Sequence, residues 1–310
     1  MDEITPRPVT VPDDLVESLT GFFGADWVRS LPLLAARRID RWELTVTGAP
    51  MHGAIALVLP VRRPDGTDAV LKLQPLDEET AGEPIALRAW DGDGAVRLLD
   101  HDPEDGSLLL EALDSGRDLD GLPLESALEE IGALLARLSA HPAPPGLRDL
   151  GEVTRDIVVQ GRRRLREIEP EGRPTFAAWI TLADELADEA GDRLIHWDLH
   201  YDNVLSPRPG EEDPRRGAWL AIDPKPLAGD PCFDLLPALR NRWEEAERSG
   251  DPVGAVRRRF DVLTAAAGLD RDRARAWTRV RMLQDCLWMD EGRHRIPRRY
   301  AAVESALESR

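Results

Sequence analysis

Residues 193–205 read Arg-Leu-Ile-His-Trp-Asp-Leu-His-Tyr-Asp-Asn-Val-Leu, and residues 217–225 read Gly-Ala-Trp-Leu-Ala-Ile-Asp-Pro-Lys. A short apolar run of strand character leads into His196 and Asp198, and Asn203 follows within the same stretch. A second apolar strand, residues 219–222, leads into Asp223. The pattern is therefore His-x-Asp-x-x-x-x-Asn, a polar turn, a strand and a second aspartate.

Phosphoryl transfer from ATP requires these groups. One carboxylate, here Asp198, receives the proton of the attacking hydroxyl, while the amide oxygen of Asn203 and the carboxylate of Asp223 hold Mg²⁺. Oxygen ligands suit this small, hard cation. Two other interpretations are open: Asp202-Asn203 alone is a turn signal, and alternation along a strand would place His196, Asp198 and His200 on one face as a metal site.

A lysine and a glutamate upstream make the pattern more specific. Lys72 lies inside the apolar strand 69–73. Glu83 lies on the inward stripe of a helix predicted over residues 79–90, where an unpaired carboxylate is costly. A Lys72–Glu83 pair would satisfy both groups, and kinases use such a pair at the α- and β-phosphates. Because Pro84 belongs in a first helical turn, the helix is expected to begin at Glu83. The alternative partners for Lys72 are Glu78 and Glu79.

The segment before residue 114 also predicts a nucleotide site. Its strands are expected at 42–46, 55–61, 69–73, 95–99 and 107–113, after two amphipathic helices at 15–23 and 27–38. A loop containing Gly48 and Gly53 joins the first two strands, and backbone N–H groups of such a loop bind phosphates. The last strand changes to polar, glycine-containing chain after Leu113. We interpret this change as a hinge, at which the backbone of Glu111 and Leu113 would bind adenine.

Composition limits the partners. The chain has 310 residues, a net charge of -18 and two cysteines, Cys232 and Cys286. This acidity argues against nucleic acid as a partner. A small cationic substrate would be easier to accommodate, but net charge alone favours the simpler interpretation that acidity keeps the protein soluble. Two cysteines exclude a disulfide framework. The first residues lack a signal-peptide pattern, and no apolar run approaches the ~18 residues of a membrane span. We expect a cytoplasmic protein without a membrane partner, monomeric or weakly dimeric.

The segment after residue 114 is expected to be mainly helical, with helices beginning near 124, at 153–168, 176–190, 252–267 and 271–291. The polar insert 206–216 is predicted to be mobile and is given no chemistry. Asp234 is expected to support the turn at His196–Asp198 through its backbone. Asp230 is expected to cap a helix, and contact with substrate is the less favoured alternative. The candidate residues for binding a cationic substrate are Asp230, Asp285, Trp288 and Asp290.

The ordered set of motifs resembles the protein-kinase-like fold of the aminoglycoside phosphotransferase superfamily. Three runs, residues 82–90, 194–205 and 222–235, are similar to the branch of streptomycin 6-kinases and hydroxyurea phosphotransferases, and Ile-Asp-Pro-Lys-Pro at 222–226 is the most specific of them. The resemblance covers roughly residues 40–291. It implies an α+β, bilobal fold with a small antiparallel-sheet lobe at 1–113 and a larger, mainly helical lobe at 114–310.

The resemblance also implies a role for each matching residue. Lys72 would hold the α- and β-phosphates of ATP and Glu83 would orient Lys72. Asp198 would act as the catalytic base, with His196 bracing the turn. The implied cofactors are ATP and Mg²⁺, the metal being bound by Asn203 and Asp223. The implied acceptor is a hydroxyl of an aminocyclitol antibiotic such as streptomycin.

Two departures from other kinases bear on the acceptor. Trp197 stands where others have arginine or a small residue, and Asp-Pro-Lys at 223–225 replaces Asp-Phe-Gly. No segment after Asp223 resembles a peptide-docking activation loop, which favours a small-molecule acceptor. The rival hypotheses are a hydroxyurea or metabolite phosphotransferase, a metallohydrolase that uses His196, Asp198 and His200, and a catalytically silent nucleotide-binding module.

Overall fold

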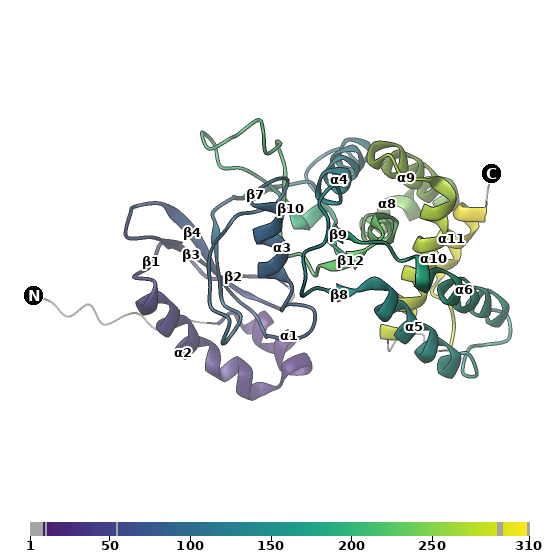
Figure 1. Ribbon diagram of the computed structural model, residues 1–310, viewed down its shortest axis with the longest axis horizontal. Coiled ribbons are helices and arrows are strands. Elements are labelled where there is room, and N and C mark those ends of the chain that lie inside the picture. Colours follow the sequence, from purple (N-terminus) through teal and green to yellow (C-terminus); the bar gives the residue numbers. More distant parts are fainter. Residues whose placement is uncertain (1–8, 10, 54, 290–293, 309–310) are drawn as a thin grey trace, which may run out of the picture.

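The computed structural model describes residues 9, 11–53, 55–289 and 294–308. Figure 1 shows two lobes side by side, a smaller one built around a sheet and a larger one built from helices. The predicted two-lobed α+β arrangement is confirmed. Among the described residues, the structure contains no helix with the length and apolar character needed to cross a membrane.

An antiparallel sheet forms the smaller lobe. Its strand order is β1-β3-β4-β6-β5, and β2 pairs with β3 at one edge. The strands are β1 (Thr45–Val46), β2 (Met51–His52), β3 (Leu57–Arg62), β4 (Asp68–Leu73), β5 (Leu98–His101) and β6 (Leu108–Glu111). In β3, alternate side chains are buried, as expected for a strand with one face on a core. The expected strand 42–46 is shorter, since α2 continues to Arg41.

Two helices cover one face of this sheet: α1 (Asp13–Phe23) and α2 (Ala25–Arg41). In Figure 1 they lie below the strands. Leu15 and Leu31 are fully buried against sheet residues such as Leu59, and together these residues form a separate small core. This core makes the lobe a unit of its own, and it leaves the opposite face of the sheet available for a ligand.

Helix α3 (Glu83–Trp90) joins the two lobes. It begins at Glu83 with a proline in its first turn, as the sequence predicted. Leu87 and Trp90 belong to the main core of the larger lobe, and the Trp90 indole N–H donates a hydrogen bond of 3.1 Å to the Leu138 carbonyl. The helix that supplies Glu83 is therefore positioned by the larger lobe.

Eight further helices build the larger lobe in the described part of the chain. They are α4 (Leu124–Leu138), α5 (Leu150–Arg164), α6 (Arg173–Leu186), α7 (Leu235–Arg240), α8 (Trp243–Arg248), α9 (Pro252–Ala267), α10 (Arg271–Trp288) and α11 (Arg298–Glu308). Helix α4 packs along α9, and α10 contacts α5 and α6. The sequence interpretation placed α9 correctly but did not include α11.

The remaining strands form two three-stranded sheets. One has the order β11-β10-β7, formed by β11 (Leu220–Ala221), β10 (Val204–Ser206) and β7 (Asp114–Asp118). The other has the order β8-β12-β9, formed by β8 (Arg148–Asp149), β12 (Leu227–Gly229) and β9 (Arg193–Ile195). Three short 3₁₀ turns are η1 (Ala187–Glu189), η2 (Tyr201–Asn203) and η3 (Pro231–Asp234). These sheets hold the 193–225 stretch beside the first sheet.

The polar insert between β10 and β11 is held in place at two points. Arg208 donates a 2.6 Å hydrogen bond to Asp68 at the start of β4. Arg216 is buried, donates to the carbonyl of Gly92 and pairs with Glu111. The insert thus connects the larger lobe to the smaller one, a different arrangement from the mobile loop that its polar composition predicted.

Candidate active site

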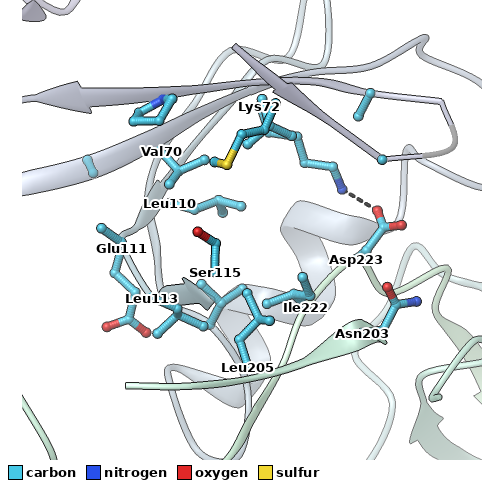
Figure 2. Close-up of a pocket in the computed structure, with 18 of the residues that line it drawn as sticks. Val70, Lys72, Leu110, Glu111, Leu113, Ser115, Asn203, Leu205, Ile222 and Asp223 are labelled. Atoms are coloured by element: carbon cyan, nitrogen blue, oxygen red, sulfur yellow. Dashed lines mark hydrogen bonds and ion pairs between the residues drawn. The ribbon is translucent and has the colours of Figure 1, made fainter. Parts of the chain in front are cut away.

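A cleft of about 660 Å³ separates the lobes and collects half of the predicted site residues. Lys72 reaches into it from the sheet, while Asp198, Asn203 and Asp223 line it from the larger lobe. Figure 2 shows the Lys72 ammonium paired with Asp223 at one side of this space, with Asn203 beside Asp223. Segments separated by more than a hundred residues therefore meet at one place, as the ordered motifs predicted.

The predicted ion pair between Lys72 and Glu83 is present. The Lys72 ammonium lies 2.8 Å from both oxygens of Glu83, and it also contacts Asp223. Gln74 donates a further hydrogen bond of 2.6 Å to Glu83. Burial disfavours the ammonium, but the charges of Asp223 and Glu83 outweigh it and raise the pKa of Lys72. Lys72 is therefore a fixed cation, and the alternative partners Glu78 and Glu79 do not contact it.

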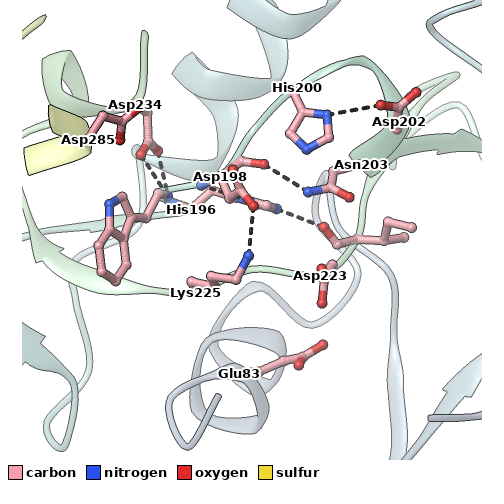
Figure 3. Close-up of polar contacts among 12 residues, drawn as sticks. Glu83, His196, Asp198, His200, Asp202, Asn203, Asp223, Lys225, Asp234 and Asp285 are labelled. Carbon is pink, nitrogen blue, oxygen red and sulfur yellow. Dashed lines mark hydrogen bonds and ion pairs between the residues drawn. The ribbon is translucent and has the colours of Figure 1, made fainter. Parts of the chain in front are cut away.

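The turn at residues 196–198 carries the proposed base Asp198 and is called the catalytic turn below. It is held by a buried carboxylate from η3. Asp234 accepts hydrogen bonds from the backbone N–H of His196 at 2.8 Å and of Trp197 at 2.6 Å, which confirms the predicted support. His196 is itself braced by backbone: its Nε2 donates to the Ile222 carbonyl at 3.0 Å, and its Nδ1 accepts from the N–H of Asp198 at 3.3 Å. Figure 3 shows these contacts converging on the turn.

The imidazole ring of His196 is neutral and bonds the backbone on both sides. Burial lowers its pKa to about 4. Both ring nitrogens are used by the backbone of the site, so neither is available to a metal. Among the residues that the structure describes, no cluster of three His, Cys, Asp or Glu side chains is arranged to hold a metal ion. The metallohydrolase hypothesis based on His196, Asp198 and His200 is therefore wrong.

Two residues beside the reactive groups have left-handed backbone angles. Trp197 has φ +68° and Asp223 has φ +55°. Such angles cost free energy in residues that carry a Cβ, and they persist where surrounding contacts impose them. Here the contacts are those of Asp234 to the first turn and of Lys72 to Asp223. The strain lies next to the carboxylates that the site must orient.

Asp198 is paired with a second lysine. The Lys225 ammonium lies 2.7 Å from Oδ2 of Asp198, and the Arg240 guanidinium lies 3.9 Å from Oδ1. Burial raises the pKa of Asp198, but the neighbouring charge of Lys225 outweighs it, so that the pKa falls well below its ordinary value. Asp198 is thus ionised at neutral pH, with Oδ2 bound to Lys225 and Oδ1 at the longer distance of 3.9 Å from Arg240.

The residues fit a Mg²⁺ ion bound with ATP. The Asn203 amide nitrogen donates a 2.9 Å hydrogen bond to the Asp198 carbonyl, which fixes the amide and leaves its oxygen for a cation. Asp223 offers a carboxylate on the same side of the cleft (Figure 3). Two protein oxygens suffice, because Mg²⁺ usually takes its remaining ligands from phosphates and water.

The inner part of the cleft is apolar, as an adenine ring requires. Val70, Leu110, Leu113, Leu205 and Ile222 line it in Figure 2. The Glu111 side chain does not contribute a free carboxylate there, because it is bound by Arg216 and by the backbone N–H of Arg97. Its backbone N–H donates to the Arg97 carbonyl at 3.0 Å, so the predicted hinge contact would fall to its backbone carbonyl.

The two predicted phosphate-loop glycines lie in different environments. Gly53 is exposed and lines the cleft. Gly48 lies against the ring of Pro60, where an added Cβ would be 3.1 Å from the nearest ring carbon, and it is not among the described residues that line the cleft. Gly48 therefore serves close packing of the loop on β3, which does not support the predicted contact with ATP.

The predicted substrate carboxylates are already occupied. Asp230 caps η3 through the N–H of Cys232 at 2.8 Å and pairs with Arg273, so the expected capping role is confirmed. Asp285 is 3% exposed and is bound by Arg240 and by the Tyr300 hydroxyl at 2.6 Å. These contacts argue against a direct role for either residue in substrate binding.

Trp288 is the predicted substrate residue with a free surface. Its side chain is 52% exposed, and its ring centroid lies 5.6 Å from that of Trp197 in the catalytic turn. Asp290 lies outside the described residues. An exposed indole beside the turn that carries Asp198 offers a stacking surface for an acceptor ring.

A family model described as "Aminoglycoside/hydroxyurea antibiotic resistance kinase" matches residues 41–292. The chain belongs to this family. It is thus a phosphotransferase that uses a hydroxyl group as acceptor, and the cleft between the two lobes is the candidate catalytic site of this family member.

Relatives and solved structures agree. A streptomycin 6-kinase from Streptomyces griseus is 48% identical over 305 residues, which cover 96% of this chain and 97% of that one. A hydroxyurea phosphotransferase from Kitasatospora aureofaciens is also 48% identical, covering 97% and 87%. The structure of choline kinase LicA from Streptococcus pneumoniae matches with a TM-score of 0.56 at 14% identity, covering 90% and 99%. This last likeness shows the fold.

The sequence interpretation did not foresee the contacts of three residues in or beside the cleft of this family member. Lys225 appeared only as part of a motif, Glu79 only as an alternative partner for Lys72, and Arg216 as part of the insert. A signal for Lys225 was present in the composition, because lysine is rare in this chain. Nothing in the local pattern distinguishes Arg216 from its neighbour Arg215, which is exposed.

Proposed function

We propose that this protein transfers the γ-phosphoryl group of ATP to a hydroxyl of streptomycin and thereby confers resistance. Residues 1–113 would bind the nucleotide, and residues 114–310 would supply the catalytic groups and bind the acceptor, in a cytoplasmic monomer or weak dimer. The observation that carries the proposal is the cleft in which Lys72, Asp198, Asn203 and Asp223 meet. The 48% identity with a streptomycin 6-kinase supports the choice of acceptor.

The chemistry follows from the positions of these side chains. The acceptor oxygen forms a bond to the γ-phosphorus while the bond from that phosphorus to the β,γ-bridging oxygen breaks, and ADP leaves with the electron pair. The hydroxyl proton passes to Asp198 and then to solvent. Lys72 binds the α- and β-phosphates. Asn203 and Asp223 would hold Mg²⁺, which neutralises phosphate charge when it is bound.

A carboxylate other than those predicted fits the cationic acceptor. Glu79 is partly buried in the loop before α3, and its carboxylate has no hydrogen bond or ion pair with any described residue. Burial raises its pKa, while Lys225 and Arg148 act in the opposite direction. Since Lys225 contacts Asp198, this carboxylate lies within electrostatic reach of the reacting groups. Glu79 is therefore our candidate for a guanidinium group of streptomycin.

Hydroxyurea is the second candidate acceptor, because the identity with the hydroxyurea phosphotransferase is equally high. It also carries planar N–H donors close to a hydroxyl, so the same carboxylate could bind either molecule. Recognition by Glu79 alone does not separate them, but size does. Streptomycin would extend over the exposed face of Trp288, whereas hydroxyurea would not reach it.

The test is an ADP-release assay with Mg-ATP and a panel of streptomycin, dihydrostreptomycin, kanamycin, hydroxyurea and simple sugars. Asp198→Ala serves as the blank. Turnover with streptomycin that is lost in the blank supports the proposal, and mass spectrometry of the product locates the phosphate. Turnover with hydroxyurea alone selects the second candidate, and nucleotide binding without turnover on any compound contradicts both.

A further inference from the structure

The chain contains only two lysines. Lysine and arginine together number 40, and all of them except Lys72 and Lys225 are arginines. Arginine supplies the cations on the surface and also those of buried pairs, such as Arg216 with Glu111 and Arg240 with Asp285. Both lysines, by contrast, line the same cleft. A chain that otherwise uses arginine has both of its lysines in this cleft, where Arg208 also lies but is paired with Asp68.

The two cations differ in shape. A guanidinium is a flat fork suited to two parallel hydrogen bonds, whereas an ammonium is compact and directs three donors outward from one atom. Lys72 uses this property, since it contacts Glu83 and Asp223 at once.

Lys225 is fixed to the catalytic turn at both ends of the residue. Its backbone N–H donates to the His196 carbonyl at 3.0 Å, and its ammonium lies 2.7 Å from Oδ2 of Asp198. Its side chain is only 23% exposed. The ion pair with Asp198 fixes this cation beside the proposed base, two residues after the proposed metal ligand Asp223.

Lys225 has donors to spare. Of the three N–H groups on its ammonium, one is directed to Asp198, and the side chain makes no other hydrogen bond with the residues that the structure describes. Figure 3 shows the ammonium rising from below toward Asp198, on the side where Asp223 also lies. The group that must occupy this place in the reaction is the γ-phosphoryl, since it lies between the metal ligands and the hydroxyl oriented by Asp198.

We propose that Lys225 is a catalytic residue that donates hydrogen bonds to the γ-phosphoryl oxygens of bound ATP while it holds Asp198. This inference rests on the phosphotransfer function proposed above and specifies the part of the nucleotide that Lys225 contacts. Lys72 serves the α- and β-phosphates from the sheet, and Lys225 serves the transferred group from the larger lobe. As the bond to the leaving oxygen breaks, charge on the transferred group stays next to the ammonium.

The test compares nucleotides with and without a γ-phosphate. Affinities for β,γ-imido-ATP and for ADP, both with Mg²⁺, are measured by calorimetry on the wild type and on Lys225→Met. We expect the affinity for β,γ-imido-ATP to fall about tenfold or more, as for the loss of a charge-assisted hydrogen bond. The ADP affinity should stay within about threefold, because the proposal places Lys225 on the γ-phosphoryl group and not on the β-phosphate. Lys72→Met is the matched control and should weaken both nucleotides.

Turnover supplies the second measurement, with the acceptor that the panel identifies. Lys225→Met is expected to lower kcat by about 10²-fold or more, with the KM of the acceptor little changed. A loss of kcat with an unchanged ratio of the two nucleotide affinities would overturn the proposal, since Lys225 would then act only by positioning Asp198. Full activity in Lys225→Arg would also overturn it, because a flat fork would then serve as well.

Two features keep the test decisive. The nucleotide affinities need no acceptor, so an error in the choice of streptomycin leaves their outcome unaffected. If Lys225→Met does not fold, as judged by its melting curve, Lys225→Gln keeps a polar side chain of moderate length and is measured in the same way. A preserved preference for the triphosphate in a folded variant of either kind refutes the contact with the γ-phosphoryl group.

Discussion

Replacing Glu83 by alanine tests the link between the sheet and α3. Glu83 is 1% exposed, and its two oxygens accept hydrogen bonds from Lys72 and Gln74. The change leaves the buried Lys72 ammonium with Asp223 as its only anionic partner among the described residues. Breaking a buried pair in this way typically costs ~3–5 kcal/mol. Because Asp223 still pairs with Lys72, we expect a loss of about 3 kcal/mol in the free energy of unfolding.

Glu83→Gln removes the negative charge of the side chain and keeps its shape. Gln74 has one amide oxygen, Oε1, that is buried without a hydrogen-bond partner. If the Gln74 amide turns over, this oxygen accepts from the new amide at position 83, while Lys72 still has an oxygen to contact. The variant should therefore lose only about 1–2 kcal/mol. Glu78→Ala, which removes an exposed carboxylate five residues earlier, is the control and should change stability by less than ~0.5 kcal/mol.

Urea unfolding and thermal melting measure the loss of stability, and the ADP-release assay measures the loss of activity. For Glu83→Ala we expect a melting temperature lower by roughly 5 °C and a kcat/KM for ATP lower by about 10²-fold, because Lys72 is then drawn toward Asp223. Glu83→Gln should lose about tenfold in the same constant. The reasoning is refuted if Glu83→Ala is no less stable than Glu78→Ala and keeps the wild-type KM for ATP.

Three further predictions concern the same site. Asp198→Asn should keep its ADP affinity by calorimetry and lose roughly 10²–10⁴-fold in turnover; turnover within a few-fold of wild type would exclude proton transfer to Asp198. Because burial lowers the pKa of His196 to about 4, the unfolded chain takes up a proton between pH 6.5 and 4 that the folded chain excludes. The free energy of unfolding should therefore fall by about 3 kcal/mol across that range. When this free energy is measured by urea unfolding at several pH values, His196→Gln should show a pH dependence smaller by one proton than the wild type. Glu79→Gln should raise the KM for streptomycin about tenfold without changing that for ATP; an equal KM would remove Glu79 from acceptor binding.

The parts of the site that the sequence predicted are those carried by short, ordered segments. A lysine in the middle of an apolar strand and a glutamate at the start of a helix have few ways to satisfy their charges, so the Lys72–Glu83 pair could be inferred from burial alone. Pro84 marked the first turn of α3 for a similar reason, since its ring fits there and not further along. These inferences needed no knowledge of distant contacts.

The parts that could not be predicted depend on which arginine meets which carboxylate. Asp285 lies on the inward face of α10, and helical spacing alone cannot say that Arg240 and Tyr300 occupy it. Arg216 belongs to a polar insert and is nevertheless buried against Glu111. With 38 arginines and 58 acidic residues in the chain, the number of alternative pairs is too large for local pattern to decide.

The contact between Lys225 and Asp198 also bears on how the proton moves. A carboxylate whose pKa is held well below its ordinary value is a weak base, so it cannot remove the hydroxyl proton before the new bond forms. In a loose transition state the acceptor oxygen becomes acidic only as it approaches the phosphorus, and a weak base then suffices. In the proposed reaction, Asp198 would therefore act first by orienting the hydroxyl and would accept the proton late. The same lysine that weakens Asp198 as a base is placed to stabilise the phosphoryl group, so both effects favour a late proton transfer.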